Sequence, residues 1–333
     1  MDRTTAEKEW LRRISGGKSA VPQRKPTSDQ TSDQSSSKPR PKPQPTAKKH
    51  GNGFGDIAGM EDLKQRVKEG FINVLQHRDL ADAYGVRPPS MLFYGPAGCG
   101  KTFFAEKMAE EVGIHFIKVV PDDLASTMVH GTQEKIGEVF KNAERHAPAL
   151  LFFDEFDAMV PRRTGNEYNQ HYDSEVNEFL CMLNHASDKG VYVLAATNHP
   201  ECIDKAVLRT GRIDELVYVD MPDHEARKSL FALELAKLPR EEDIDMDRLA
   251  HLTQGFNCSD INYIVKSAAR KKFNEAIGCG EHTLQNITQK QLEEIISGRS
   301  PSVSSRDLRE YQRVHREFSP KDKGGQPASI GFR

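Results

Sequence analysis

Two hydrophobic patterns alternate along the middle of the chain. Short runs in which every residue is apolar stand between longer segments whose apolar positions recur at helical spacing. Such runs are typical of parallel strands buried on both faces, because the helices of βαβ units cover both sides of the sheet. We expect strands at 91–94, 115–120, 150–153, 191–196 and 216–219. Helices are expected around them at 61–80, 102–111, 133–145 and 175–184.

After Pro222 the pattern is helical throughout. Helices are expected at 224–236, 247–252, 259–276 and 289–296. The sequence therefore predicts an α/β domain at 51–221, with a parallel five-stranded sheet flanked by helices. A small all-helical domain is predicted at 222–318. The length of 333 residues agrees with about two domains.

Both ends of the chain are polar. Residues 1–50 carry twelve Lys and Arg against five Asp and Glu, and residues 319–333 are polar and glycine-rich. Segments with so few apolar residues cannot offset the entropy of ordering, so we expect both to be disordered. We interpret the basic tail as a solvated linker in preference to a docking or nucleic-acid arm. An amphipathic segment around Trp10 is a candidate partner-binding peptide.

The first chemical motif joins the 91–94 run to the next helix. It reads Gly-Pro-Ala-Gly-Cys-Gly-Lys-Thr from Gly95, which is the P-loop pattern in the strand–loop–helix setting that it requires. Glycines let the backbone amides wrap a polyphosphate, and the helix N-terminus adds partial positive charge. Lys101 is expected on the β- and γ-phosphates and the Thr102 hydroxyl on Mg²⁺. The expected nucleotide-binding residues here are Pro96, Ala97, Gly98, Cys99, Gly100, Lys101, Thr102 and Phe103.

A second motif follows the 150–153 run, where Asp154 and Glu155 leave a buried strand. Parallel strands end at one edge of a sheet, so these carboxylates are expected to face the P-loop. Asp154 is expected to hold Mg²⁺ through its water shell, and Glu155 to orient and activate the attacking water. A solvated acidic turn is the alternative. The two motifs together predict hydrolysis of a nucleoside triphosphate as well as its binding.

Composition bears on membrane association, secretion and metal binding. No apolar run approaches the roughly 20 residues that span a bilayer, so no membrane span is expected. The N-terminus lacks the apolar core of a secretory signal. Five cysteines without a C-x-x-C pair favour a reducing cytoplasm over a disulfide framework or a zinc site. The twelve histidines show no metal-ligand spacing on a shared helix face, so Mg²⁺ is the only metal expected.

Five further segments carry motifs: 54–60, 193–198, 204–214, 255–261 and 299–304. In that order they resemble the opening segment, the sensor-1 strand, the second region of homology, the lid segment and the lid end of the AAA module of the AAA+ ATPases. The resemblance covers the chain from Phe54 to about Tyr311, and the lid end is similar to that of protein-remodelling members such as katanin and spastin. It implies a P-loop NTPase sheet followed by a helical lid domain, with ATP and Mg²⁺ as the bound cofactors.

The resemblance also implies roles for single residues. Asn198 would be sensor 1, which positions the attacking water, although an Asn here could simply cap the next turn. Arg212 would be an arginine finger that reaches the nucleotide of a neighbouring subunit, with a surface salt bridge as the alternative. A finger supplied to a neighbour implies a homo-oligomeric ring, which in this family is a hexamer. The implied adenine contacts are Asp56, Ile57 and Ala58, together with Cys258 and Ser259 in the lid.

Four positions depart from the family pattern. Ala97 replaces a usual proline, and Cys258-Ser259 replaces Gly-Ala; both changes are expected to be tolerated. Glu215 stands where many members carry a second arginine finger, which predicts slow turnover. The pore-loop segment 128–130 lacks the aromatic residue of unfoldases.

Three functions therefore stay open. The favoured hypothesis is a hexameric ATPase that remodels protein substrates or complexes, recruited through the tail, the pore or an adaptor. The second is an ATP-gated assembly scaffold with slow hydrolysis, which the missing pore aromatic and second finger favour. The third, a nucleic-acid motor or loader, is supported only by the basic tail and the P-loop. Nucleic acid is therefore not the partner that we expect.

Overall fold

The computed structural model describes residues 51–124, 131–162, 179–209, 211–278 and 284–318. The chain separates into two units, 1–43 and 44–333, and all of the described residues belong to the second. The predictions of disorder at 1–50 and 319–333, and the pore-loop interpretation at 128–130, lie outside the described residues. Within this part of the chain, no helix combines the length and apolar composition needed to cross a membrane.

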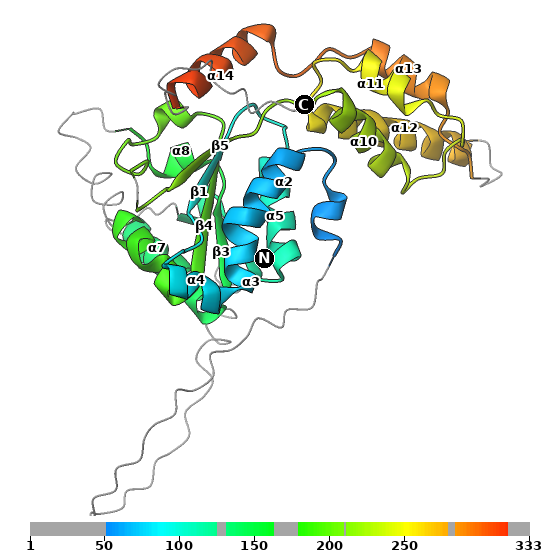
Figure 1. Cartoon of the computed structure of the whole chain (residues 1–333). Coiled ribbons are helices and arrows are strands. Elements are labelled where there is room, and N and C mark those ends of the chain that lie inside the picture. The colour runs from blue at the N-terminus through cyan, green and yellow to red at the C-terminus, as the bar shows by residue number, and fades with distance from the viewer. Residues whose placement is uncertain (1–50, 125–130, 163–178, 210, 279–283, 319–333) are drawn as a thin grey trace, which may run out of the picture. The chain divides into compact units, whose positions relative to one another are not determined.

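A five-stranded parallel sheet forms the centre of the α/β part, and its strand order is β2-β3-β4-β1-β5. The predicted α/β fold is confirmed, and each strand begins and ends within one residue of its expected bounds. The order places β4 between β1 and β3, so the strands before the two chemical motifs flank a common neighbour (Figure 1). The strands are β1 (Met91–Tyr94), β2 (His115–Val119), β3 (Ala149–Phe153), β4 (Val191–Thr197) and β5 (Glu215–Tyr218).

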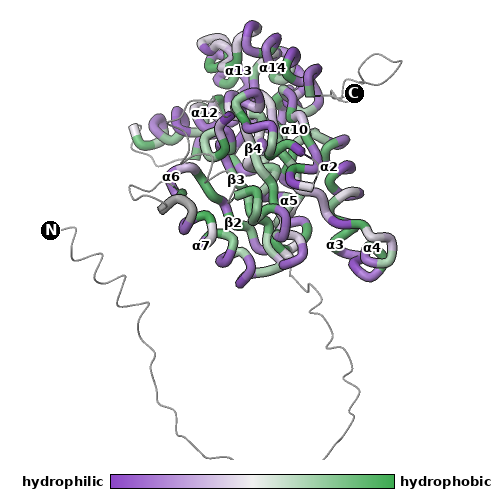
Figure 2. Tube along the Cα trace, turned by 90° about the vertical axis from the view of Figure 1, so that its left-hand side faces the viewer, coloured by the Kyte–Doolittle hydropathy of each residue, from purple (hydrophilic) through white to green (hydrophobic). Residues whose placement is uncertain are grey.

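Each face of the sheet carries its own hydrophobic core. Neighbouring residues of a strand point to opposite faces, and helices cover both faces, so the strands are apolar at every position. On one face Leu151 and Phe153 pack with α7 (Gly131–Arg145) and the helical residues 179–186. On the other face Leu150 and Phe152 pack with α5 (Lys101–Val112) and the helices before β1. Figure 2 shows the hydrophobic colour following the inner strands.

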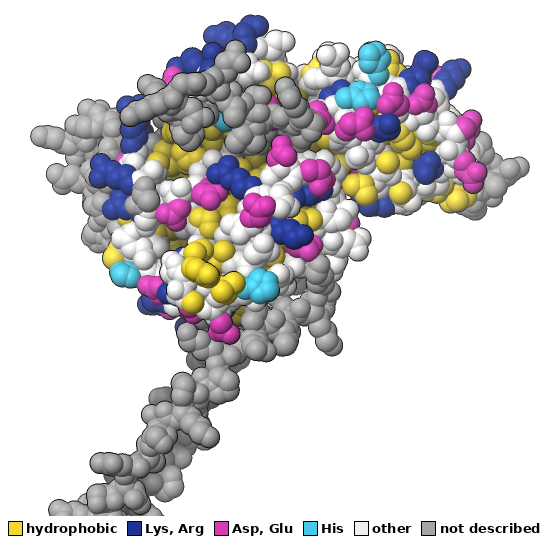
Figure 3. Space-filling view, viewed as in Figure 1, with side chains coloured by type: hydrophobic (Ala, Val, Ile, Leu, Met, Phe, Trp, Pro, Cys, Tyr) yellow, Lys and Arg dark blue, Asp and Glu magenta, His cyan; other side chains and the backbone are white. Residues whose placement is uncertain are grey.

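The single helix expected at 61–80 is wrong. The segment instead forms α2 (Glu61–Val67), a π-helical stretch (Lys68–Ile72), α3 (Asn73–Gln76) and, after a break, α4 (Arg78–Tyr84). The wider π turn changes the helical register, so that Val67, Phe71, Ile72 and Leu75 all remain buried. At His77 the backbone leaves the helical region, with φ −117° and ψ 52°. The next helix, α4, buries none of its residues, and Figure 3 shows hydrophobic side chains gathered over it.

Short helical segments complete the α/β part. They connect the strands and the main helices without contributing a core of their own. They are the 3-10 turns Gly53–Asp56, Ser187–Lys189 and Pro200–Cys202, together with α6 (Pro121–Leu124) and α8 (Phe156–Met159).

The helices after Pro222 build a third core. Side chains such as Phe231, Leu249, Ile261 and Leu292 are fully buried against one another there. Three of the helices begin at a side chain that caps them: Asp223, Asp245 and Thr288 each accept a backbone N–H three residues on. The helices are α10 (His224–Leu235), α11 (Met246–Leu252), α12 (Cys258–Gly278) and α13 (Gln289–Ser297).

One further helix, α14 (Ser305–Phe318), was not predicted. It is strongly charged, and Val314 is its only buried residue, so its sequence lacks a broad apolar stripe. It returns to the sheet, where His315 Nδ1 lies 2.8 Å from the Tyr94 hydroxyl and the imidazole stacks on Tyr218 with ring centroids 4.4 Å apart. Burial lowers the pKa of His315. Aromatic contacts thus hold α14 where an apolar stripe would otherwise be needed (Figure 1, red).

Candidate functional site

A glycine-rich loop connects β1 to α5, and its shape depends on two glycines. Gly95 has φ +143°, and a Cβ there would lie 2.2 Å from the Val219 carbonyl oxygen. Gly98 has φ +77°, and a Cβ there would lie 2.5 Å from Asn257 Nδ2. Neither position can hold a side chain without displacing its neighbour. Helix α5 starts at Lys101 behind Gly100, so its first backbone amides are presented to the loop.

Lys101 is folded against this loop. Its ammonium group donates to the carbonyl oxygens of Gly95 at 2.9 Å and Pro96 at 2.8 Å. Only 8% of the residue is exposed, and burial lowers the pKa of Lys101 to about 8. A cation held in so poorly hydrated a position gains strongly from an approaching anion.

Asp154 directly follows β3 and lies beside the start of α5 and beside β2. The Thr102 hydroxyl donates to Asp154 Oδ2 at 3.0 Å, which brings together the two residues expected to bind Mg²⁺. The ammonium of Lys118 lies 2.8 Å from the same oxygen. Lys118 was not predicted, although a lone lysine in the otherwise apolar second half of β2 was a visible signal. Because β2 pairs with β3, with Lys118 opposite Phe152, it stands beside the second motif.

Glu155 has an unusual backbone conformation. Its φ of 52° lies in the left-handed region, which is costly for a residue with a Cβ and is often found at functional sites. The side chain is exposed, and the backbone N–H donates to Asp154 Oδ1 at 3.2 Å. The turn directs the chain away from β3 into α8, leaving the Glu155 carboxylate accessible to solvent.

Asn198 follows β4 directly. In the sheet register Thr197 lies beside Tyr94 of β1, and Ala195 lies beside Phe153 of β3. Asn198 therefore leaves the sheet between the glycine-rich loop and the Asp154–Glu155 pair. Its strand, β4, lies beside the strand that ends at Asp154. The Thr197 hydroxyl donates to Asp157 Oδ1 at 2.5 Å and accepts the His199 backbone N–H at 2.8 Å, which fixes this end of β4.

A cavity of about 200 Å³ opens beside the loop. It is mostly apolar and lies between the segment before α2, the loop and the start of α12. Pro96, Ala97, Lys101 and Thr102 are not part of its lining, so the cavity lies beside the loop without including these four residues. Sequence reasoning missed several lining residues, among them Met60, Leu230 and Asn262. The predicted residues that do line it are Asp56, Ile57, Ala58, Gly98, Cys99, Gly100, Phe103, Cys258 and Ser259.

The start of α12 contacts the loop directly. Asn257 Nδ2 donates to the Ala97 carbonyl at 3.0 Å, and the Ser259 N–H donates to the Gly98 carbonyl at 3.1 Å. Asp260, which is 1% exposed, accepts from Arg299 at 2.8 Å and from the Ser302 N–H at 3.0 Å. Burial alone would raise the pKa of Asp260, but these hydrogen bonds outweigh it and lower the pKa.

Arg212 lies away from this cavity. Its guanidinium donates to the Ala206 carbonyl oxygen at 2.7 Å within the same segment, and it is not among the lining residues. The structure therefore does not bring Arg212 together with the other predicted site residues. Glu215, on β5, pairs with Arg66 at 3.0 Å.

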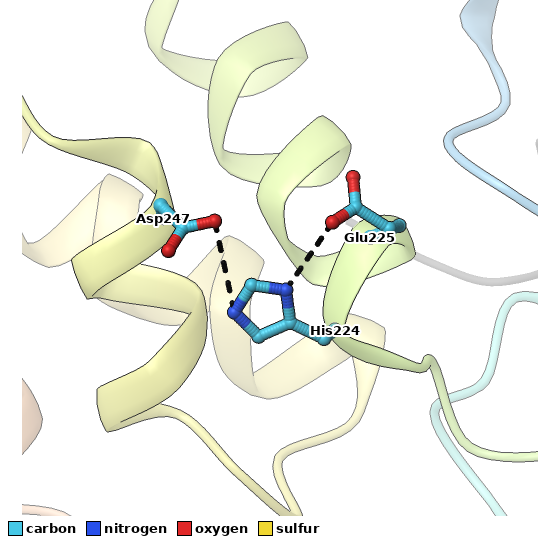
Figure 4. Close-up of side chains that lie close together, drawn as sticks. All are labelled: His224, Glu225 and Asp247. Atoms are coloured by element: carbon cyan, nitrogen blue, oxygen red, sulfur yellow. Dashed lines mark hydrogen bonds and ion pairs between the residues drawn. The ribbon is translucent and has the colours of Figure 1, made fainter.

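A separate polar cluster joins α10 to α11 (Figure 4). His224 Nδ1 lies 3.4 Å from Glu225 Oε1, and its Nε2 lies 4.0 Å from Asp247 Oδ1. The two ring nitrogens thus face different carboxylates, and Lys228 already pairs with Asp247 at 3.2 Å. We interpret the group as an ion-pair network between two helices.

The parallel sheet, the glycine-rich loop before α5 and the carboxylates after β3 define a P-loop nucleoside-triphosphate-binding protein. Residues 91–221 match the family model described as "ATPase family associated with various cellular activities (AAA)". The chain therefore contains an ATPase module of the AAA family.

Two relatives illustrate the similarity. A "Cell division cycle protein 48 homolog" from Archaeoglobus fulgidus is 33% identical over 273 residues, which is 79% of this chain and 37% of the relative. A "Putative cell division cycle ATPase" from Plasmodium falciparum is 34% identical over 241 residues, which is 72% of this chain and 19% of the relative. This chain thus spans well under half of the length of either relative.

Proposed function

We propose that the chain binds ATP with Mg²⁺ and hydrolyses it to ADP and phosphate. The observation that carries the proposal is the contact between the Thr102 hydroxyl and Asp154 at the mouth of the glycine-rich loop. A hydroxyl and a carboxylate are the hard oxygen donors that Mg²⁺ prefers, so the residues present fit the ion. When bound, the ion would neutralise charge on the β- and γ-phosphates.

The remaining steps of the proposed mechanism use side chains of this chain. Lys101 exchanges its two loop carbonyls for the β- and γ-phosphates, and the amides at the start of α5 hold the phosphate oxygens. Glu155 takes the proton of the attacking water, and the Asn198 carboxamide positions that water in line with the γ-phosphate. The oxygen of the water bonds to the γ-phosphorus while the bond to the β–γ bridging oxygen breaks, which leaves ADP.

We propose that residues 51–221 act as the ATPase domain and 222–318 as its lid. Their hydrogen bonds at Ala97 and Gly98 support coupling of the lid to the loop that holds the phosphates. Arg212, which does not reach the site of its own subunit, is proposed to complete the site of a neighbour in a homo-oligomeric ring, which we infer to be a hexamer. The ring is proposed to act in the cytoplasm on a polypeptide substrate or adaptor.

Remodelling of protein complexes is the activity that we favour for this ring. The second candidate, an ATP-gated scaffold with slow hydrolysis, is supported by Glu215. This residue stands at the usual place of a second arginine finger and pairs with Arg66 of its own subunit. ATP turnover that rises when a substrate is added would favour remodelling over the scaffold.

Two substitutions test the proposal. Lys101→Ala is expected to abolish ATP binding, because it removes the cation on the phosphates. Glu155→Gln is expected to keep ATP binding while lowering turnover by about 10²-fold or more, the scale of general-base catalysis. Isothermal titration measures the binding and phosphate release measures the turnover. Wild-type hydrolysis by Glu155→Gln would show that another group is the base. The same variant can serve as a trap to isolate the substrate.

A further inference from the structure

One polar atom at the cavity lacks a partner. Helix α12 places Cys258, Ser259 and Asn262 on the cavity, at the three- and four-residue spacing that puts side chains on one helix face. The carboxamide oxygen of Asn262 is buried, and it accepts no hydrogen bond from any described residue. A buried acceptor without a partner costs free energy, so a ligand that supplies the missing donor would be favoured.

The two carboxylates that line the cavity are already engaged. Asp56 pairs with Lys107 at 2.9 Å, and Glu234 pairs with Lys237 at 3.1 Å. Hydrogen bonds from Lys107 and Asn52 lower the pKa of Asp56, which keeps it an ionised ion-pair partner. Among the side chains that line this cavity, the Asn262 oxygen is the buried acceptor left without a donor.

We propose that Asn262 selects adenine as the base of the bound nucleotide. Adenine carries an exocyclic N6 amine, a donor that a carboxamide oxygen accepts, whereas guanine and hypoxanthine carry an acceptor oxygen at that position. With either of these bases the Asn262 oxygen would face a second acceptor and stay unsatisfied. Buried polar groups left unpaired in this way are an effective means of rejecting a ligand.

This inference rests on the proposed function, because it requires a nucleotide whose phosphates lie on the loop and whose base enters the cavity. It goes beyond that function because it assigns base selection to one residue of the lid. The purine ring would lie between the 56–58 segment and the start of α12, which contribute lining residues from opposite ends of the module.

The test compares dissociation constants of ATP and inosine triphosphate, which differ at the purine by an N6 amine against an oxygen. Asn262→Ala is expected to weaken ATP by about 3- to 10-fold, the loss of one hydrogen bond, and to leave inosine triphosphate unchanged. The ratio of the two affinities should thus fall toward one. Alanine favours helices, so α12 is expected to fold. Asn274→Ala, an exposed asparagine of the same helix that does not line the cavity, is the matched control and should keep the wild-type ratio.

Two outcomes would overturn the assignment. An unchanged ratio of the two affinities in Asn262→Ala, whether both nucleotides are weakened equally or neither is weakened, would exclude base selection while the wild type still binds ATP. Loss of ATP affinity that is absent with 2′-deoxy-ATP would place Asn262 on the ribose. By contrast, a wild-type protein that binds neither triphosphate would refute the proposed function itself.

Discussion

The two ends of the proposed nucleotide site are built on different principles. The phosphate end consists of one contiguous loop, a helix N-terminus, the buried charge of Lys101 and the half-buried charge of Asp154, which pairs with the exposed Lys118. The base end is an apolar cavity assembled from segments near residues 57, 99, 230 and 260, and its unpaired polar group is a neutral carboxamide. Changes of charge should therefore affect the phosphate end, and changes of shape or hydrogen bonding the base end.

Among these tests, removal of the proposed arginine finger should have the largest effect, and it should act on ATP turnover without affecting binding at either end of the site. Arg212→Ala is expected to lower ATP turnover by about 10³-fold or more, because an arginine finger stabilises charge in the transition state. ATP and adenosine should still bind, since Arg212 lies outside the cavity.

Mixing Arg212→Ala with Glu155→Gln sharpens this test. Each variant lacks a different half of a shared site, so some interfaces in a mixed ring would be complete and some activity should return. Turnover per subunit should also rise with protein concentration, because ring assembly follows mass action. A monomer that hydrolyses ATP at a constant rate per subunit would exclude a finger supplied by a neighbour.

The pH dependence of binding separates the two ends directly. Without phosphate the pKa of Lys101 is about 8, lowered by burial, and bound phosphates would raise it. The affinity for ATP should therefore be highest below pH 8, where Lys101 is charged without ATP as well. Above pH 8 the affinity should fall by at most about tenfold per pH unit. Adenosine, which lacks phosphates, should bind with no such dependence. Lys101→Arg stays charged and should flatten the ATP curve. A steep fall of adenosine affinity with pH would contradict the conclusion that the titrating charge belongs to the phosphate end alone.

Lys118 should give the smallest of these effects. It competes with a cation for Asp154 Oδ2, so Lys118→Leu is expected to lower the Mg²⁺ concentration for half-maximal turnover by about 2- to 5-fold, as for partly exposed ion pairs. Lys189→Leu removes a similarly exposed lysine, paired with Glu144, and should leave the Mg²⁺ requirement unchanged. A higher requirement in Lys118→Leu would indicate that Lys118 binds phosphate instead.

The same contrast explains what the sequence could predict. The strands and the loop depend on local patterns, namely apolar runs and glycines at fixed spacing, and these were predicted within one residue. The break at His77 was missed because no glycine or proline stands between Gln76 and Tyr84 to mark the end of α3 in the sequence. Lys118 was visible as a lone lysine in an apolar run, but its contact with Asp154 depends on the pairing of β2 with β3. Asn262 was missed because its place at the cavity depends on the docking of α12, which no local pattern records.

The aromatic contacts of α14 have a practical consequence. Residues 305–318 look like a charged tail, and a shortened protein ending before Ser305 would be a natural choice for expression. Such a protein would lose the imidazole on Tyr218 and the partner of the Tyr94 hydroxyl. Tyr94 directly precedes Gly95, so the cut would expose an aromatic surface to water beside the turn that is proposed to receive the triphosphate. Low activity in that shortened form would then reflect a damaged loop, and would say nothing about the catalytic residues themselves.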